Sequence, residues 1–97
     1  PQAIQREDGS WLLDGMLSID DFKDLFQLEE LPHEREVDYY TIGGFVTSYL
    51  GSIPQASQSF RWNGLRFEIV DTDRARVDKV LVQRIQEEDK HEPDKTD

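Results

Sequence analysis

Residues 41–44, Thr-Ile-Gly-Gly, have the composition of an anion-binding helix start. Free backbone N–H groups and the positive end of the helix dipole meet at a helix N-terminus, where they can hold a phosphate or carboxylate. Thr41, Gly43 and Gly44 are therefore the candidate ligand-binding residues. The segment contains no lysine or arginine and no phosphate-loop pattern. We favour the alternative, in which both glycines let the helix start pack closely against a strand or the Asp38–Tyr39 loop.

Three aspartates at the start of another expected helix, Asp20, Asp21 and Asp24, could collect a hard cation. Magnesium and calcium need several convergent oxygens, but Asp21 is offset from the face that the other two share. A simpler interpretation is that these acids complement the positive end of the helix dipole. Residues 71–73 begin like a calcium loop, yet Arg76 stands where such a loop requires glycine. The sequence therefore predicts no metal site.

The sequence contains no set of residues that is expected to converge and act in catalysis. His33 and His91, the only histidines, lie in charged segments where no buried acid is expected to orient them. We therefore predict that the chain is not an enzyme. Several aromatic residues could stack on an isoalloxazine or adenine ring, although their alternating spacing favours a place in the core. These residues are Trp11, Phe60, Trp62 and Phe67.

A hairpin and a helix open the predicted fold. Residues 3–6 and 10–14 form the hairpin, with Asp8-Gly9 as a tight primed turn. The helix follows Ser18, whose hydroxyl is expected to cap it by accepting from the Asp21 N–H. Helical spacing defines its buried stripe. The stripe consists of Ile19, Phe22, Leu25 and Phe26.

The second helix begins after Thr41, its N-cap, and has the clearest amphipathic pattern in the chain. Gly51 ends this helix and Pro54 prevents its continuation. Gly43 and Gly44 in its first turn cost roughly 1 kcal/mol each relative to alanine, so a close backbone approach is expected to require them. The apolar positions are Ile42, Phe45, Val46, Tyr49 and Leu50.

The second hairpin joins residues 57–62 to 65–71 through Asn63-Gly64, the strongest turn signal in the chain. A turn at 71–74 then leads to a last strand at 75–86. One face of that strand is expected to carry Val77, Leu81 and Ile85, and the other Val80 and Val82. Because both faces are partly apolar, the pattern predicts a central strand or a bulge.

The composition limits the classes of function. The chain has 97 residues, no cysteine and a net charge of −10. Residues 1–38 carry −8, residues 39–86 carry +2 and residues 87–97 carry −4. An acidic surface repels phosphate backbones, so nucleic-acid binding is not expected. No apolar run exceeds three residues, so this chain is not expected to insert into a membrane.

Together these patterns predict an α+β fold. The expected domain, residues 3–86, is small and two-layered, with a mainly antiparallel sheet and two short helices. Residues 87–97 are expected to form a disordered acidic tail. The chain begins at Pro1 rather than methionine, which is typical of a fragment of a longer protein.

Four motifs occur in a recognisable order along the chain. They are D-G-S-W-L-L-D-G at 8–15, D-Y-Y-T-I-G-G-F-V at 38–46, L-G-S-I-P at 50–54 and G-L-R-F-E-I at 64–69. With Val77, Val80 and Val82 of the last strand, this order resembles the CorC/HlyC transporter-associated domain. The resemblance covers about residues 3–86. Tyr40 departs from the pattern, because the family often has an acid or amide there.

The resemblance implies a module at the C-terminus of a bacterial membrane protein, on the cytoplasmic face of the inner membrane. In such proteins it follows a membrane domain and a tandem pair of CBS domains, which are its implied partners. The parent proteins of this kind are linked to magnesium and cobalt efflux, and some are called hemolysin-like. The resemblance also implies a fold similar to a domain of some flavin-dependent oxidases.

The leading hypothesis is a non-catalytic regulatory module of a transporter of this type, without a cofactor. Two alternatives stay open. The aromatic hairpin and Gly43-Gly44 suit a module that binds an adenine nucleotide or a flavin such as FAD. The uneven charge and the edges of the sheet suit a structural module that forms a homodimer.

Overall fold

The computed structural model describes residues 1–29, 31, 39–52 and 54–85. Some of the expectations lie outside these residues, namely those for His33, Asp38, Ile53, His91 and the tail at 87–97. Within the described ranges the chain forms two helices and one five-stranded antiparallel sheet, which is the predicted α+β class.

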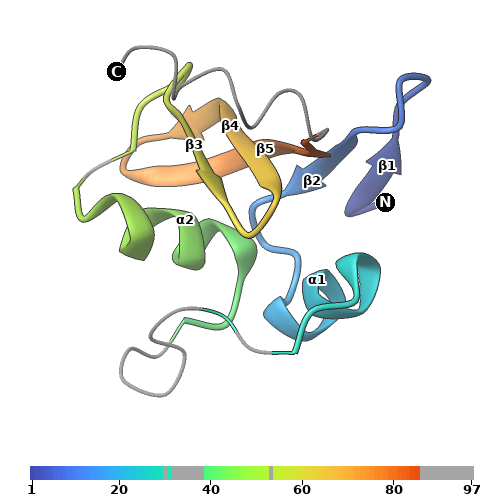
Figure 1. The fold of residues 1–97 in the computed structure, drawn as a ribbon. Coiled ribbons are helices and arrows are strands. Elements are labelled where there is room, and N and C mark those ends of the chain that lie inside the picture. The colour runs from blue at the N-terminus through green and yellow to red at the C-terminus, as the bar shows by residue number, and fades with distance from the viewer. Residues whose placement is uncertain (30, 32–38, 53, 86–97) are drawn as a thin grey trace, which may run out of the picture.

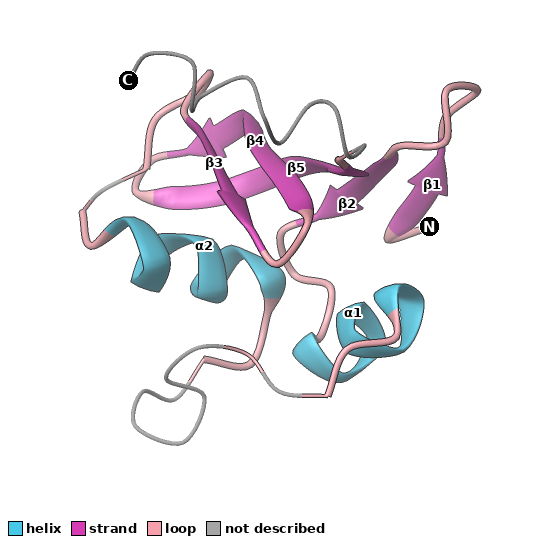
Figure 2. Cartoon of the chain, in the orientation of Figure 1, coloured by secondary structure: helices cyan, strands magenta, loops and turns pink. Residues whose placement is uncertain are grey.

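Both helices lie on the same side of the sheet, so the domain has two layers (Figures 1 and 2). The sheet order is β1-β2-β5-β4-β3, which makes β5 the central strand, as predicted. The strands are β1 (Ala3–Gln5), β2 (Trp11–Asp14), β3 (Ser59–Trp62), β4 (Leu65–Asp73) and β5 (Arg76–Arg84). The helices are α1 (Ile19–Phe26) and α2 (Ile42–Leu50).

Each helix turns its apolar stripe toward the sheet. In α1 the buried side chains are Ile19, Phe22 and Phe26, as the spacing predicts, while Leu25 is half-buried. In α2 they include Ile42, Phe45 and Val46. Complete burial of one such side chain stabilises the fold by roughly 1.5–3 kcal/mol, so these stripes hold the two layers together.

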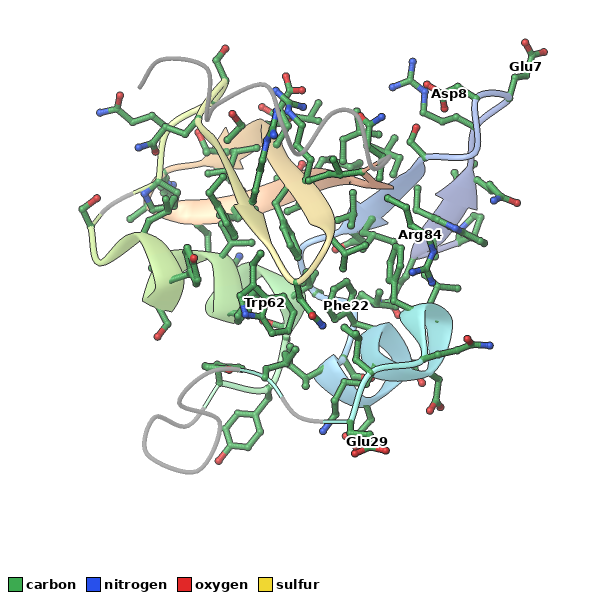
Figure 3. All side chains as sticks on the ribbon, viewed as in Figure 1. Glu7, Asp8, Phe22, Glu29, Trp62 and Arg84 are labelled. Carbon is green, nitrogen blue, oxygen red and sulfur yellow. The ribbon has the colours of Figure 1, made fainter. Side chains whose placement is uncertain are left out.

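An aromatic cluster joins the layers around Phe67 of β4, which has no exposed surface. Its ring centroid lies 6.0 Å from that of Phe22 in α1 and 5.7 Å from that of Phe45 in α2. Phe60 stacks on it at 4.8 Å with an interplanar angle of 6°. Figure 3 shows Phe22 and Trp62 pointing into the space between sheet and helices.

The two predicted hairpin turns have different outcomes. Asn63 and Gly64 have φ angles of 55° and 77°, the positive values that a primed two-residue turn requires. The prediction for Asp8-Gly9 is wrong, because only Gly9 has a positive φ, at 91°. The Gly9 N–H donates to the Arg6 carbonyl at 3.0 Å, and the Arg6 N–H donates to the Ser10 carbonyl at 2.8 Å. These bonds close a three-residue loop, another common hairpin connection.

The structure corrects two details of the last hairpin. The turn lies at Arg74–Ala75 rather than at 71–74, because β4 continues to Asp73. Val77 was expected on the face opposite Val80 and Val82, but all three are buried together. The pairing register of β4 and β5 shifts on both sides of Asp71, and the second shift returns Val77 to the core.

Candidate functional site

The N-termini of α1 and α2 lie side by side and bond to each other. Ser18 and Thr41, the N-cap residues, form an isolated antiparallel bridge. The first N–H of α1 donates to the Tyr40 carbonyl at 2.8 Å, and the first N–H of α2 donates to the Leu17 carbonyl at 2.9 Å. Each helix start therefore supplies a partner for a donor that the other helix cannot satisfy internally.

Both predicted caps are confirmed. The Ser18 hydroxyl oxygen accepts from the Asp21 N–H at 3.0 Å, and the Thr41 hydroxyl oxygen accepts from the Gly44 N–H at 3.1 Å. Both cap residues have extended backbone angles, which aim their side chains back at the third helical N–H.

All four leading N–H groups of α2 have partners inside the protein. The first two donate to the carbonyls of Leu17 and Gly15, each at 2.9 Å. The third donates to the Thr41 hydroxyl, and the fourth donates to the Thr41 carbonyl at 3.0 Å. An anion at Gly43 and Gly44 would have to displace these bonds. The ligand-binding role predicted for Thr41, Gly43 and Gly44 stays a prediction. Because the N–H groups of both glycines already have partners, a ligand there would have to bind to other groups of the site.

The glycines at this junction allow backbone contacts that a side chain would block. A Cβ atom on Gly43 would lie 2.9 Å from the Gly15 carbonyl oxygen and 3.3 Å from that of Val77. A Cβ atom on Gly15 would overlap the Val77 carbonyl oxygen. A Cβ atom on Gly44 would lie 3.1 Å from the Cβ atom of Tyr39. The helix start was predicted to pack against a strand or the Asp38–Tyr39 loop, and it contacts both Val77 of β5 and Tyr39.

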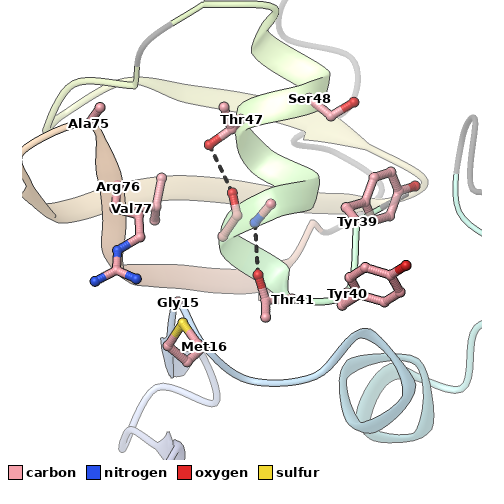
Figure 4. A pocket seen from close by; sticks show the side chains of 12 residues that line it. Gly15, Met16, Tyr39, Tyr40, Thr41, Thr47, Ser48, Ala75, Arg76 and Val77 are labelled. Carbon is pink, nitrogen blue, oxygen red and sulfur yellow. Dashed lines mark hydrogen bonds between the residues drawn. The ribbon is translucent and has the colours of Figure 1, made fainter. Parts of the chain in front are cut away.

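A pocket of about 540 Å³ opens beside this junction. Figure 4 shows Arg76 and Met16 on one side of the first turns of α2, and Tyr39 and Tyr40 on the other. The predicted residues Thr41, Gly43 and Gly44 all line it. Its other lining residues are Gly15, Met16, Tyr39, Tyr40, Thr47, Ser48, Ala75, Arg76 and Val77. Its size is that of a small-molecule site.

The polar groups of the pocket are mostly hydroxyls. The Thr47 hydroxyl donates to the Gly43 carbonyl at 2.9 Å, and the Thr41 oxygen is the helix cap. Ser48 adds a third aliphatic hydroxyl, and Tyr39 and Tyr40 carry phenolic ones. Arg76 is the one charged side chain among the described lining residues, and it makes no ion pair with any described residue.

The aromatic residues considered for ring stacking mostly belong to the core, as favoured above. The ring of Phe60 is stacked between those of Tyr49 and Phe67, so both of its faces are covered. The ring centroids are 4.4 Å and 4.8 Å away, respectively. The ring of Trp62 packs edge-on against that of Phe45, with 5.6 Å between the ring centroids. Trp11 is half-buried and lines a separate pocket.

This second pocket, of about 340 Å³, lies between the first hairpin, α1 and the end of β5. Its charged groups already have partners. Asp8 accepts from the Ser10 hydroxyl at 2.6 Å, and this bond lowers the pKa of the Asp8 carboxyl below its ordinary value. The Arg84 guanidinium lies 5.3 Å from the Phe26 ring centre and donates to the Phe26 carbonyl. These groups stabilise the hairpin and the helix end.

The acids of α1 do not converge. The Asp20 side chain is 92% exposed and lies 4.0 Å from Lys23. No group of three histidine, cysteine or acidic side chains in the described part of the chain could hold a metal ion. No described helix is long and apolar enough to cross a membrane.

Sequence reasoning missed Met16 and Arg76 as pocket residues. Met16 comes from the β2–α1 connection and Arg76 from the first position of β5, which are about 60 positions apart in the chain. Only the packing of α2 brings them beside Thr41. The one available signal was Gly15, the last residue of the D-G-S-W-L-L-D-G motif.

The chain matches a known family over most of its length. A family model described as the transporter-associated domain CorC_HlyC matches residues 4–86. The solved CorC_HlyC domain of a Xylella fastidiosa Temecula1 hemolysin, in complex with Mg²⁺ and Mn²⁺, is 41% identical. It superposes with a TM-score of 0.76 over 89% of this chain and 100% of that chain.

Curated relatives are much longer than this chain. A UPF0053 protein of Synechocystis is 54% identical over 88 residues, which are 91% of this chain and 20% of that protein. The polyamine export protein of Escherichia coli K12 is 40% identical over 84 residues, which are 87% of this chain and 18% of that protein. The chain thus spans about a fifth of the length of these relatives. By its family match and its fold, it belongs to the CorC/HlyC transporter-associated domain family.

Proposed function

We propose that this chain is a non-catalytic regulatory module of a bacterial membrane ion transporter of the magnesium/cobalt-efflux or hemolysin-like type. One observation carries the proposal: the chain spans all of a solved domain of its family but only a fifth of its curated relatives. It is therefore an accessory unit attached to a larger protein. One relative is named a polyamine export protein, and this name supports a parent protein that transports cations.

The proposed partners are the CBS and membrane domains of the same parent protein. The domain itself would be residues 3–86, with 87–97 as a tail, and it would lie at the cytoplasmic face of the inner membrane. A module regulates only if it binds differently to two states of its partner. The junction of Gly15, Gly43 and Val77 supports this role, because its direct backbone contacts make a stiff support for a neighbouring surface.

The test is an efflux assay on the full-length protein. Deletion of residues 3–86 is expected to change the rate of Mg²⁺, Co²⁺ or putrescine efflux from loaded cells, or its dependence on the internal concentration. A second variant, Ser48→Trp, would fill the pocket without removing the domain, and Arg74→Gln would serve as a surface control. Unchanged flux of all three cations in the deletion variant, at matched protein levels, would contradict the regulatory role.

A module for an adenine nucleotide or flavin is the second candidate. It is supported by the pocket, which Thr41, Gly43 and Gly44 line together. Calorimetric titration with FAD, ATP and AMP tests it. This candidate fails if no heat and no flavin quenching appear at about 1 mM ligand, the weak end of useful affinity.

A structural module that forms a homodimer is the third candidate. Strands β1 and β3 are the outer strands of the sheet, and such edges can pair with another chain. Sedimentation at low and high salt separates the cases. A monomer at every protein concentration would rule this candidate out.

A further inference from the structure

We infer that the pocket beside α2 binds an anionic amphipathic small molecule, whose carboxylate or phosphate pairs with Arg76 and whose apolar body lies against Met16 and Tyr40. The inference names a ligand class for the site and rests on the proposed regulatory function only for the consequence of binding.

The charge of the pocket differs from that of the whole chain. The chain has a net charge of −10, whereas the described residues that line the pocket include one guanidinium and no carboxylate. Asp73 lies opposite Arg76 in the strand pairing but does not line the pocket and makes no ion pair with it. Arg76 is exposed, so its planar fork of donors can meet a carboxylate or phosphate in two parallel bonds.

The walls of the pocket supply the apolar part of the site. Tyr40 is 76% exposed and Met16 is 56% exposed, although both have large and largely apolar side chains. They stand on opposite sides of the α2 N-terminus, and both line the pocket (Figure 4). A flat apolar body between them would remove this surface from water, which is favourable in proportion to the area buried.

The remaining polar groups favour an acceptor-rich ligand. Thr41 accepts from the Gly44 N–H, so its hydroxyl hydrogen is left to donate outward. The Ser48 hydroxyl can donate in the same way. A divalent cation or a polyamine is held best by carboxylates, and the described lining residues include no acidic side chain. The site therefore suits an anion rather than a transported cation.

The test uses the 97-residue chain and four naphthalene probes of matched shape: 1-naphthyl phosphate, 1-naphthaleneacetate, 1-naphthaleneacetamide and 1-naphthylmethylammonium. Binding is followed by the amide resonances of Gly15, Gly43, Gly44 and Ala75. Both anions should bind about tenfold more tightly than the neutral amide, because bonds to a charged partner are stronger than neutral ones. The cation should leave these resonances unchanged, and the tighter of the two anions identifies the acidic group preferred.

Arg76→Gln should weaken both anions about tenfold, to the affinity of the amide. Arg74→Gln makes the same change of charge two residues away, outside the pocket, and should leave all affinities unchanged. Equal binding of cation and anion, shifts confined to other amides, or equal effects of the two variants would overturn the inference. Anion binding without any change of flux in the deletion assay would instead refute the regulatory function and leave the ligand class standing.

Discussion

The helices α1 and α2 both begin with a hydroxyl side chain as N-cap, but they differ at the two positions that follow the first helical residue. In α1 these positions are Asp20 and Asp21, both exposed. In α2 they are Gly43 and Gly44, which press against backbone and side-chain atoms of other segments. Acids near a helix start stabilise it through the dipole, and glycine destabilises it. At these two positions α1 therefore has residues that favour a helix start locally, whereas α2 has residues that its tertiary contacts require.

This difference also explains why the glycine pair resembles an anion site and is not an open one. A helix start that binds an anion leaves its N–H groups free. At α2 the second N–H donates to the Gly15 carbonyl, and a methyl group on Gly43 would collide with that same carbonyl. The missing side chains thus serve an internal bond. Substitutions at equivalent positions of the two helices measure how far the starts differ.

Gly15→Ala should have the largest effect. Its methyl group would overlap the Val77 carbonyl oxygen, and the Gly15 carbonyl would lose its fixed position opposite the N–H of Gly43. We expect a loss of about 3 kcal/mol in the free energy of unfolding, the upper range for overpacking. Urea unfolding measures the loss. A loss below about 1 kcal/mol would mean that the segment around Gly15 can move away from Val77 and that this contact does not fix the junction.

Gly43→Ala should destabilise the domain by about 2 kcal/mol, because the new methyl group meets two backbone oxygens that cannot rotate away. Asp20→Ala is the matched control at the same position of α1. It removes an exposed dipole partner and should cost about 0.5 kcal/mol or less. Melting temperatures of both variants provide the comparison, and equal shifts would show that the two helix starts do not differ.

Thr41→Ala should cost about 1.5 kcal/mol and Ser18→Ala about 0.7 kcal/mol, within the range for lost N-caps. The difference arises because the bond from the Gly44 N–H to Thr41 is partly buried, whereas the bond from the Asp21 N–H to Ser18 is exposed to water. Chemical unfolding of both variants checks the order. If Ser18→Ala were the more damaging change, burial would not govern these caps.

Gly44→Ala should have the smallest effect of the three glycine substitutions, a destabilisation of about 1 kcal/mol or less. The added methyl group would lie 3.1 Å from the Cβ atom of Tyr39, a tight contact with a side chain, and alanine returns up to about 1 kcal/mol of helix preference. A lower urea midpoint than the unsubstituted chain is expected. A higher midpoint would show that Tyr39 yields and that this part of the helix start is open.

Much of this fold follows from local signals in the sequence. Ser18, Thr41 and Gly51 mark helix ends because their side chains or backbone freedom satisfy groups within a few residues. Asn63-Gly64 sets its turn by the same local logic. These features need no information about the rest of the chain.

Other features depend on partners that are distant in sequence. The register shift around Asp71 arises from how β4 and β5 pair, and it alone decides which face Val77 occupies. The pocket requires Met16, Thr41 and Arg76 to meet, and no periodicity links their segments. The close packing of Gly43 and Gly44 could be expected from their cost in a helix, but the identity of their contacts could not.

The bridge between Ser18 and Thr41 couples the starts of the two helices. The first amide of α1 and the first amide of α2 each bond to a carbonyl beside the other cap, so opening of either helix start breaks a bond to the other. Native-state hydrogen exchange should therefore give Ile19 and Ile42 similar protection, with one shared free energy of opening. The helices would unfold as a single cooperative unit, although 15 residues separate Phe26 from Ile42.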